Sequence, residues 1–351
     1  MAKKGYGKKL LLVFFFLLAI LYLITSPGDT PYNYFTRLSE AFLKGNFYLE
    51  KAPAWLNELI PADGNKFFAP YPPMPAILSA PLTFIFRGYF KQQHLAHILG
   101  AGIVVLTAKL AFVLKKGRKI AIFMGLLSGL GTIIWFLSAN GSSWYLGQIT
   151  AAFFLTAALV ETFDKKRPIV VGVFLGAAYL SRLQTILSLP LFLYLLRGIK
   201  KEGYINFALG LMPFFLFNIF YNYTRFGVFW DKGYTLIPGV LDEPWYQKGI
   251  FHISYVPRHI KAAFLSFPVF IKNPPYIIPN WQALSIWITT PVFIYTFWAP
   301  IKKRVTQLAW LSIFLISIPI FTHGTTGFTQ FGYRFAVDFY PLLFLLIILG
   351  M

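Results

Sequence analysis

The sequence predicts an all-α polytopic membrane protein, with residues 1–351 forming one transmembrane domain of about 10 membrane segments. Three observations support this prediction. First, 57% of the residues are hydrophobic and only 13% are charged, whereas a soluble domain carries roughly a quarter charged residues. Second, the mean hydropathy is +0.62. Third, the apolar residues form long runs, and short basic clusters adjoin these runs.

The basic residues are distributed as in the cytoplasmic loops of membrane proteins. A net charge of +20 would suit a nucleic-acid partner if it formed one patch. Instead, 17 of the 32 basic residues lie in five clusters beside apolar runs. These are Lys3, Lys4, Lys8 and Lys9; Lys115, Lys116, Arg118 and Lys119; Lys165, Lys166 and Arg167; Arg197, Lys200 and Lys201; and Lys302, Lys303 and Arg304. We therefore expect a multi-pass protein of the cell membrane with a cytoplasmic N-terminus and no nucleic-acid partner.

The first apolar run, residues 10–26, follows basic residues as in a signal peptide, but no small-x-small cleavage site ends it. We expect an uncleaved outward span followed by an external loop at about 27–92. The next span is predicted at 93–114. Residues 70–90 contain five prolines, and a crossing there would place Lys115 to Lys119 outside. This segment is therefore predicted to be re-entrant or interfacial.

The rest of the chain continues the same alternation. Spans are predicted at about 120–138 and 145–163, then a broken hairpin over 168–196, which is too short for two spans of about 20 residues each. A span at 204–222 leads to an external loop at 225–280. Spans at about 282–300 and 305–321 precede an external loop at 322–338. Met351 cuts the final apolar run, which predicts a chain truncated within a span.

Asp29 is the leading catalytic candidate. By this topology nine of the twelve acidic residues are external, so chemistry that needs a carboxylate belongs on the outer face. Asp29 directly follows the first span, where an acid is costly to keep and therefore a functional candidate. The alternative is an ordinary turn residue, because Pro-Gly-Asp-Thr is typical turn chemistry.

Arginines at membrane depth suggest that an anion binds. Arg182 lies inside the predicted hairpin and needs an anionic or carbonyl partner, and arginine suits bidentate phosphate binding. Arg334 and Asp338 are spaced i, i+4, so a local helical ion pair is one interpretation. His94 and His97 share a helix face without a nearby acid, which favours a structural role over a metal site. Further candidates in the loops are Lys66, Tyr71, Asn222 and Tyr333.

Several of these segments resemble, in order, the integral-membrane glycosyltransferases of the GT-C superfamily. The likeness is to the dolichyl-phosphate-mannose protein mannosyltransferases (glycosyltransferase family 39) and the bacterial aminoarabinose transferases. The segments that carry it are Gly28-Asp29-Thr-Pro-Tyr with Leu43-Lys-Gly45, Tyr71-Pro-Pro, Gly172 to Arg182, Asn222-Tyr-Thr-Arg-Phe-Gly227, and Phe331-Gly-Tyr-Arg-Phe-Ala-Val-Asp-Phe-Tyr-Pro341. Together they cover nearly the whole chain.

The resemblance implies a GT-C-like helical bundle that moves a sugar from a polyprenyl- or dolichyl-phosphate donor to an acceptor on the outer face. Asp29 would be the general base, and inversion at the anomeric carbon would follow. The partners would be the lipid-linked donor, membrane lipids and a glycan, lipid or protein acceptor. Substrate binding would fall to Lys66, Tyr71, Arg182, Asn222, Tyr333, Arg334 and Asp338.

The chain also departs from the pattern of the family that it resembles. Thr30 follows Asp29 where many relatives carry a second acid, and residues 140–144 offer none. No metal-ligand motif is present, so no cofactor is predicted and metal dependence is left open. The alternatives are a transporter or flippase of lipid-linked saccharides and an inactive GT-C-like scaffold. Because the polar residues gather in outer loops and not at the midplane, an enzyme is favoured.

Overall fold

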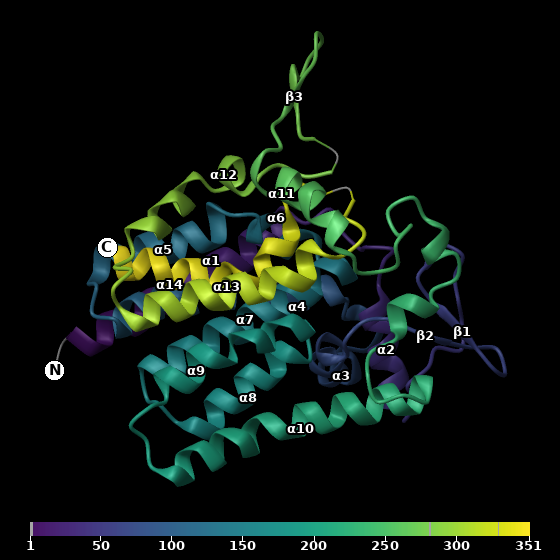
Figure 1. The fold of residues 1–351 in the computed structure, drawn as a ribbon, viewed down its shortest axis with the longest axis horizontal. Coiled ribbons are helices and arrows are strands. Elements are labelled where there is room, and N and C mark those ends of the chain that lie inside the picture. Colours follow the sequence, from purple (N-terminus) through teal and green to yellow (C-terminus); the bar gives the residue numbers. More distant parts are fainter. Residues whose placement is uncertain (1–2, 281, 329) are drawn as a thin grey trace.

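The computed structural model describes residues 3–280, 282–328 and 330–351, and it is mostly helical (Figure 1). Five helices are long and apolar enough to cross a membrane: α1 (Lys3–Ile24), α4 (Gln92–Val113), α7 (Ser143–Phe163), α10 (Lys201–Phe226) and α13 (Arg304–Phe321). α5 (Arg118–Leu130) and α6 (Ile134–Asn140) make a sixth span if the pair, bent by 53°, counts as one. The protein is therefore a helical membrane protein with five or six candidate spans among the described residues.

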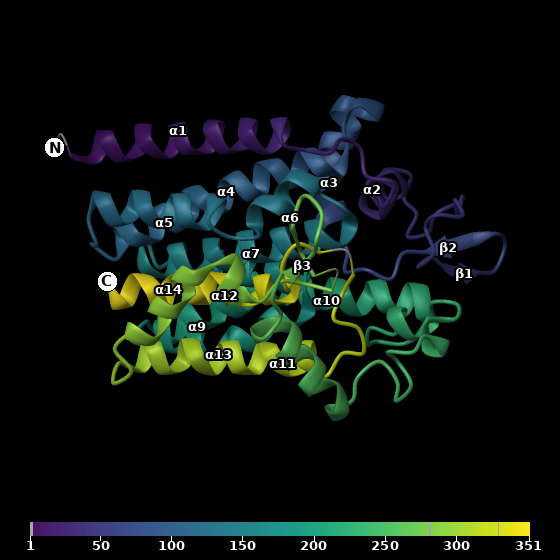
Figure 2. The same ribbon diagram turned by 90° about the horizontal axis from the view of Figure 1, so that it is seen from above.

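Long helices run side by side along the longest axis, and α1 lies at one edge (Figures 1 and 2). α4 and α7 form the centre and pack against each other, and α1 packs mainly on α4. The final apolar run forms α14 (Tyr340–Gly350), nine of whose eleven residues are buried. At 1.5 Å per residue α14 is about 16 Å long, roughly half the bilayer core.

The predicted broken hairpin is present as α8 (Pro168–Tyr179), the 3₁₀ helix η2 (Leu183–Ser188) and α9 (Leu189–Leu195). Its two ends meet, because Lys166 Nζ donates a hydrogen bond to the Arg197 carbonyl at 3.3 Å. Arg182 consequently occupies the turn between the two halves. α8 packs closely along α10, and α9 packs on α13.

Two predicted segments differ in their detail. Residues 282–300 were expected to form a regular span, but they fold as the short α12 (Ile286–Thr289) and the 3₁₀ helix η6 (Pro291–Trp298). Pro291 and Pro300 bracket the 3₁₀ segment, and a proline lacks the N–H that a continuous α-helix would need.

Residues 70–90 form α3 (Met74–Phe86) and the 3₁₀ turn η1 (Arg87–Tyr89). With 13 residues, or about 20 Å, α3 is too short to cross the bilayer core.

The loops at the end where α1 finishes build a small cap. It contains α2 (Tyr34–Leu43), the hairpin of β1 (Ile60–Ala62) and β2 (Lys66–Phe68), and the 3₁₀ turns η3 (Gly233–Leu236) and η4 (Val240–Asp242). Later in the chain come η5 (Ile253–Tyr255), α11 (Val256–Phe264), the hairpin of β3 (Val269–Phe270) and β4 (Ile277–Ile278), and η7 (Arg334–Phe339).

One side chain, Gln92, ties this cap to the bundle. Its Oε1 accepts from the backbone N–H groups of Phe35 and Thr36 at 3.1 and 3.3 Å, which serves the otherwise unpaired first turn of α2. Its Nε2 donates to the Tyr32 and Gly141 carbonyls at 3.2 and 2.8 Å. The Asp29 loop, the start of α4 and the α6–α7 turn are therefore fixed to one another.

Candidate functional site

Arg182, whose side chain is 26% exposed, forms an ion pair with the buried Asp338. Arg182 Nη2 and Nε lie 3.1 and 3.2 Å from Asp338 Oδ2, and Gln184 Nε2 donates to the same oxygen at 2.5 Å. Asp338 is fully buried in η7. The alternative of a local Arg334–Asp338 pair is not what the structure shows. In a 3₁₀ helix, with 3.0 residues per turn, positions i and i+4 do not share a face.

Arg334 is a buried cation in the same 3₁₀ helix as Asp338, and it is only 8% exposed. α7 holds its backbone, because Gln148 Nε2 donates to the Arg334 carbonyl at 3.0 Å. The guanidinium lies over the rings of Phe335 and Tyr145, 4.6 and 5.8 Å from their centroids. Its Nε is buried without a hydrogen-bond partner, and no ion pair is recorded for Arg334 within the described residues.

Burial lowers the pKa of Arg334 from its ordinary value, and repulsion from the Arg182 charge adds to this effect. Burying a charge without a counter-charge is costly. A buried guanidinium with unused donors beside a second arginine therefore favours the binding of an anion, to which arginine presents a planar fork of N–H groups.

Glu58 is the carboxylate that the sequence did not single out. It lies between α2 and β1, and its oxygens accept from Trp144 Nε1 at 3.0 and 3.3 Å and from the Tyr234 hydroxyl at 3.4 Å. Burial raises the pKa of Glu58 to about 7, although the Trp144 hydrogen bond and the Arg334 charge oppose the rise. A clue was available: Glu58 is flanked by Leu56, Leu59 and Ile60, an apolar setting for an acid.

Asp29 is held separately, at the start of α4. Gln93 Nε2 donates to its Oδ1 at 2.5 Å, and Lys91 Nζ lies 3.6 Å from its Oδ2. The side chain is 64% exposed, so its carboxylate is accessible to solvent. None of its recorded contacts is with Arg182 or Arg334. Asp29 and Glu58 are connected through Tyr32, which lies three residues after Asp29. The ring centroid of Tyr32 is 4.5 Å from that of Trp144, the residue that donates to Glu58.

The other predicted binding residues have diverse surroundings. The Tyr333 hydroxyl lies 2.6 Å from His259 Nδ1, beside Arg334 in the chain. Tyr71 is buried against Tyr34, whose hydroxyl accepts from the Glu58 backbone N–H. Lys66 lies over the Tyr48 ring, 4.4 Å from its centroid. Asn222 accepts a hydrogen bond from Arg225 Nη2 at 3.1 Å. Lys66 and Asn222 therefore have structural partners outside the arginine cluster.

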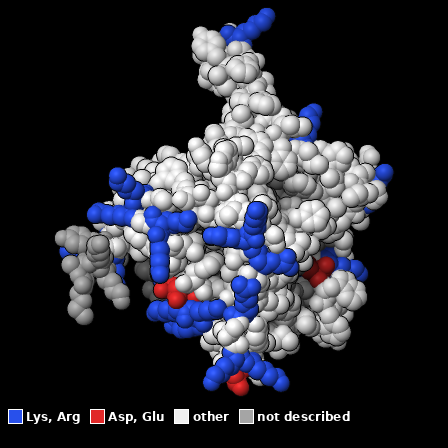
Figure 3. Space-filling view, turned by 60° about the vertical axis from the view of Figure 1, so that its left-hand side comes forward, with Lys and Arg blue, Asp and Glu red and all other residues white. Residues whose placement is uncertain are grey.

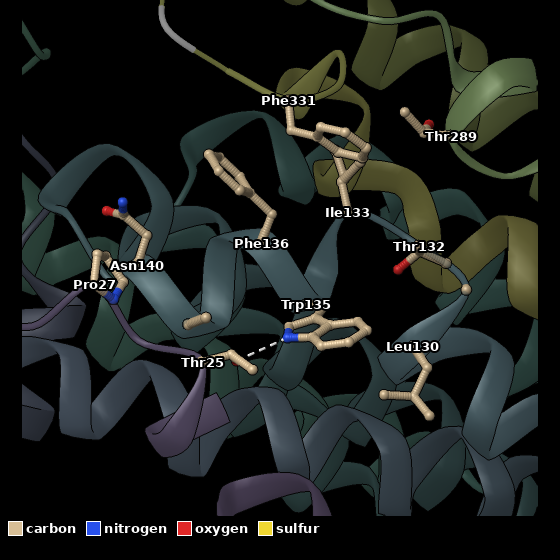
Figure 4. A pocket seen from close by; sticks show the side chains of 12 residues that line it. Thr25, Pro27, Leu130, Thr132, Ile133, Trp135, Phe136, Asn140, Thr289 and Phe331 are labelled. Atoms are coloured by element: carbon tan, nitrogen blue, oxygen red, sulfur yellow. Dashed lines mark hydrogen bonds between the residues drawn. The ribbon is translucent and has the colours of Figure 1, made fainter. Parts of the chain in front are cut away.

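The structure contains an apolar cavity of about 630 Å³ (Figure 4). Its lining has no charged side chain and comes from four places: the end of α1, the bend between α5 and α6, α12, and the segment before η7. These residues are Thr25, Pro27, Leu130, Gly131, Thr132, Ile133, Trp135, Phe136, Ala139, Asn140, Thr289 and Phe331. Phe136 and Phe331 face each other, with ring centroids 6.1 Å apart (Figure 4).

Residues of the cavity wall lie close to the surroundings of Arg334 and to the Asp29 loop. Phe136 also packs on Tyr145, at 5.5 Å between ring centroids, and Tyr145 in turn faces the Arg334 guanidinium. Pro27, which also lines the cavity, lies two residues before Asp29. Tyr145 therefore connects the cavity wall to the Arg334 guanidinium, and the Asp29 loop begins beside the cavity.

A scan against protein-family models, a search of curated proteins and a search of solved structures gave no match for this chain. Among the described residues, no three His, Asp or Glu side chains converge as metal ligands.

Proposed function

We propose that this protein is a membrane glycosyltransferase that takes a sugar from a polyprenyl- or dolichyl-phosphate donor and passes it to an acceptor at the outer face. The observation that carries the proposal is the buried Arg334 guanidinium, which has no carboxylate partner among the described residues and lies over the ring of Tyr145, a side chain that packs on Phe136 in the wall of an apolar cavity. A lipid phosphate fits both parts, because its charge suits the arginine and its chain suits the apolar wall.

Arg334 would hold the donor phosphate, with Arg182 adding positive potential beside it. The acceptor hydroxyl oxygen attacks the anomeric carbon of the sugar as the bond from that carbon to the phosphate oxygen breaks. The electron pair leaves with the polyprenyl phosphate, whose growing negative charge the arginines stabilise. Asp29 accepts the proton of the acceptor hydroxyl, as the resemblance implies. Its exposure suits this role, since the acceptor arrives from outside.

Glu58 would bind the sugar of the donor, and it would not take the proton of the acceptor hydroxyl. Its carboxylate accepts hydrogen bonds from Trp144 and Tyr234, Tyr32 packs on Trp144, and the positive charge of Arg334 acts on the carboxylate. A carboxylate can accept hydrogen bonds from two sugar hydroxyls, while aromatic faces pack against the apolar side of a sugar ring. In this arrangement the sugar would lie beside the phosphate to which it is attached.

The orientation belongs to the same proposal. With the N-terminus cytoplasmic, the cap that holds Asp29 and Glu58 lies outside. The count of about 10 membrane segments includes α3, the 168–196 hairpin taken as one broken segment, η6 and α14 in addition to the six candidate spans.

The decisive experiment uses the purified protein in liposomes with a panel of polyprenyl-phosphate sugars, and it measures release of polyprenyl phosphate. One donor should be consumed, and Asp29→Asn should lower the rate by about 10²- to 10⁴-fold. Asp63→Asn, at an exposed acid in the β1–β2 turn, is the matched control and should retain full activity.

Full activity in Asp29→Asn would reject Asp29 as the base. If no donor is cleaved and a lipid-linked saccharide instead crosses the liposome membrane, the transporter alternative replaces the enzyme.

A further inference from the structure

The hairpin of β3 and β4 projects away from the bundle (Figure 1). Every residue from 269 to 279 is exposed, and Phe270 is 76% exposed. Only Lys272 and Asn273 in this stretch are polar; the others are aliphatic, aromatic or proline. Figure 3 shows the projection as almost entirely uncharged, with a basic side chain at its tip. The chain has no acidic residue between Glu243 and Asp338.

The base of the hairpin is firmly attached. Ser266 Oγ donates to the Ala283 carbonyl at 2.6 Å, and the Ser285 N–H donates to the Ser266 carbonyl at 3.0 Å. Both arms therefore leave the bundle from a fixed point beside α11, whose Ala262 and Ala263 are buried. The direction of the hairpin is set by this clamp and not by its own two short strands.

The direction of the hairpin and its position along the long helices indicate where it lies relative to a membrane. The hairpin leaves the bundle across the direction of the long helices (Figure 1), so it extends parallel to a membrane that those helices would cross. Along the helix direction it lies near the C-terminal end of α1 (Figures 1 and 2). That end marks one boundary of the hydrocarbon layer, since α1 is a candidate span with an uninterrupted apolar run.

Neither bulk water nor the hydrocarbon core suits this segment. In water, an isolated two-stranded hairpin is marginal, and an apolar strand with free edges promotes aggregation. In the hydrocarbon core, the outward backbone N–H and C=O groups would have no partners. The interface between headgroups and acyl chains satisfies both requirements, because the side chains reach hydrocarbon while water and headgroups serve the backbone.

We propose that residues 269–279 form a lateral membrane anchor that lies in the lipid interface at the C-terminal end of α1. Phe270, Tyr276 and Ile277 enter the boundary of the acyl chains, and Lys272 extends to the headgroup phosphates. The absence of acidic residues nearby makes this surface compatible with anionic lipids. This proposal is independent of the glycosyltransferase assignment.

The chain has no cysteine, so single labels can be placed without background. Phe270→Cys and Ile277→Cys would each carry an environment-sensitive fluorophore in the protein reconstituted into phosphatidylcholine–phosphatidylglycerol liposomes. Asp63→Cys, in the exposed β1–β2 turn, is the water-facing control. We expect blue-shifted emission at 270 and 277, iodide quenching several-fold weaker than at 63, and strong quenching by lipids brominated near the headgroup.

Two outcomes would overturn the proposal. Iodide quenching at both hairpin positions as strong as at position 63 would place the hairpin in water. Blue-shifted emission that disappears when the protein is diluted in excess lipid would show that a second copy of the chain, and not lipid, covers the hairpin. Two label positions keep the test valid if one variant fails to fold.

Discussion

At the scale of single residues, the structure sorts the charged candidates by their partners. Arg182 has a buried counter-charge in Asp338, whereas Arg334 has none among the described residues. Asp29 is exposed and held by Gln93 and Lys91, whereas Glu58 lies in an aromatic setting. Positions that looked equivalent in the sequence therefore differ in what they can bind.

The role of Arg334 is tested by Arg334→Lys. Lysine keeps the positive charge but loses the planar fork of donors, so kcat/KM for the lipid-phosphate donor should fall about 10- to 100-fold, which corresponds to one or two charge-assisted hydrogen bonds. The matched control is Arg118→Lys, at the exposed arginine that begins α5. Equal activity of the two variants would remove Arg334 from the phosphate site.

The role of Glu58 is tested through pH. Its folded-state pKa, about 7, lies above the ordinary value of 4.5. The folded state therefore binds more protons than the unfolded state between these values, and this group's stabilising contribution is lost as pH rises through about 7. Burial lowers the pKa of His259 and His323 to about 4, and their effect on stability has the opposite sign. The comparison with Glu58→Gln isolates the glutamate.

We expect the Tm of the wild type, relative to that of Glu58→Gln, to fall between pH 5 and 8. Parallel pH profiles for the two proteins would show that the pKa of Glu58 is not raised. In the activity assay, Glu58→Gln should raise KM for the donor and Asp29→Asn should lower kcat. The reverse result would make Glu58 the base.

At the scale of elements, glycines set how closely α8 and α10 approach. A Cβ at Gly172 would lie 2.2 Å from the Phe207 carbonyl oxygen, and one at Gly210 would lie 2.1 Å from the Ile169 carbonyl oxygen. These obstacles are backbone atoms, which cannot rotate aside. Small residues allow such backbone approach between membrane helices. The contact also fixes α8, at whose end Arg182 begins the turn of the hairpin.

Gly210→Ala should therefore separate α8 from α10 and destabilise the fold by about 1–3 kcal/mol, as overpacking does. The measurement is the Tm in detergent. The control is Gly203→Ala in the same helix, where the added Cβ meets only the Ile199 side chain, which can move. An unchanged Tm for Gly210→Ala would show that the two helices are not packed as closely as described.

At the scale of the whole molecule, the two ends of the helical bundle differ. Basic clusters gather at the end that holds the N-terminus (Figure 3), where Lys109 also pairs with Asp164 at 3.0 Å. The cap with Asp29 and Glu58 occupies the opposite end (Figure 2). This polarity is the basis of the proposed orientation, because clusters of Lys and Arg favour the cytoplasmic side.

The orientation is testable with the cysteine-free chain. Asp63→Cys should react with a membrane-impermeant maleimide in intact cells, whereas Lys119→Cys should react only after the membrane is permeabilised. Both residues are exposed, so accessibility and not burial decides the result. Labelling of Lys119→Cys in intact cells would reverse the topology.

The sequence by itself determined the membrane class and the positions of most long helices, because hydropathy and basic clusters are local properties of the chain. It also predicted the interruption of residues 168–196 around Arg182, since two basic ends and a short apolar length leave little alternative. The prediction of a regular span at 282–300 was wrong, because prolines interrupt this apolar run and it forms a short helix and a 3₁₀ helix.

Only the tertiary structure decided how the side chains pair. Arg182 and Asp338 are 156 residues apart, Trp144 and Glu58 are 86 apart, and no local pattern connects them. The same holds for the cavity, whose walls come from four separate segments, and for the lateral direction of the β3–β4 hairpin. Hydropathy specifies which segments leave water, but a buried charge finds its partner only when packing brings distant segments together.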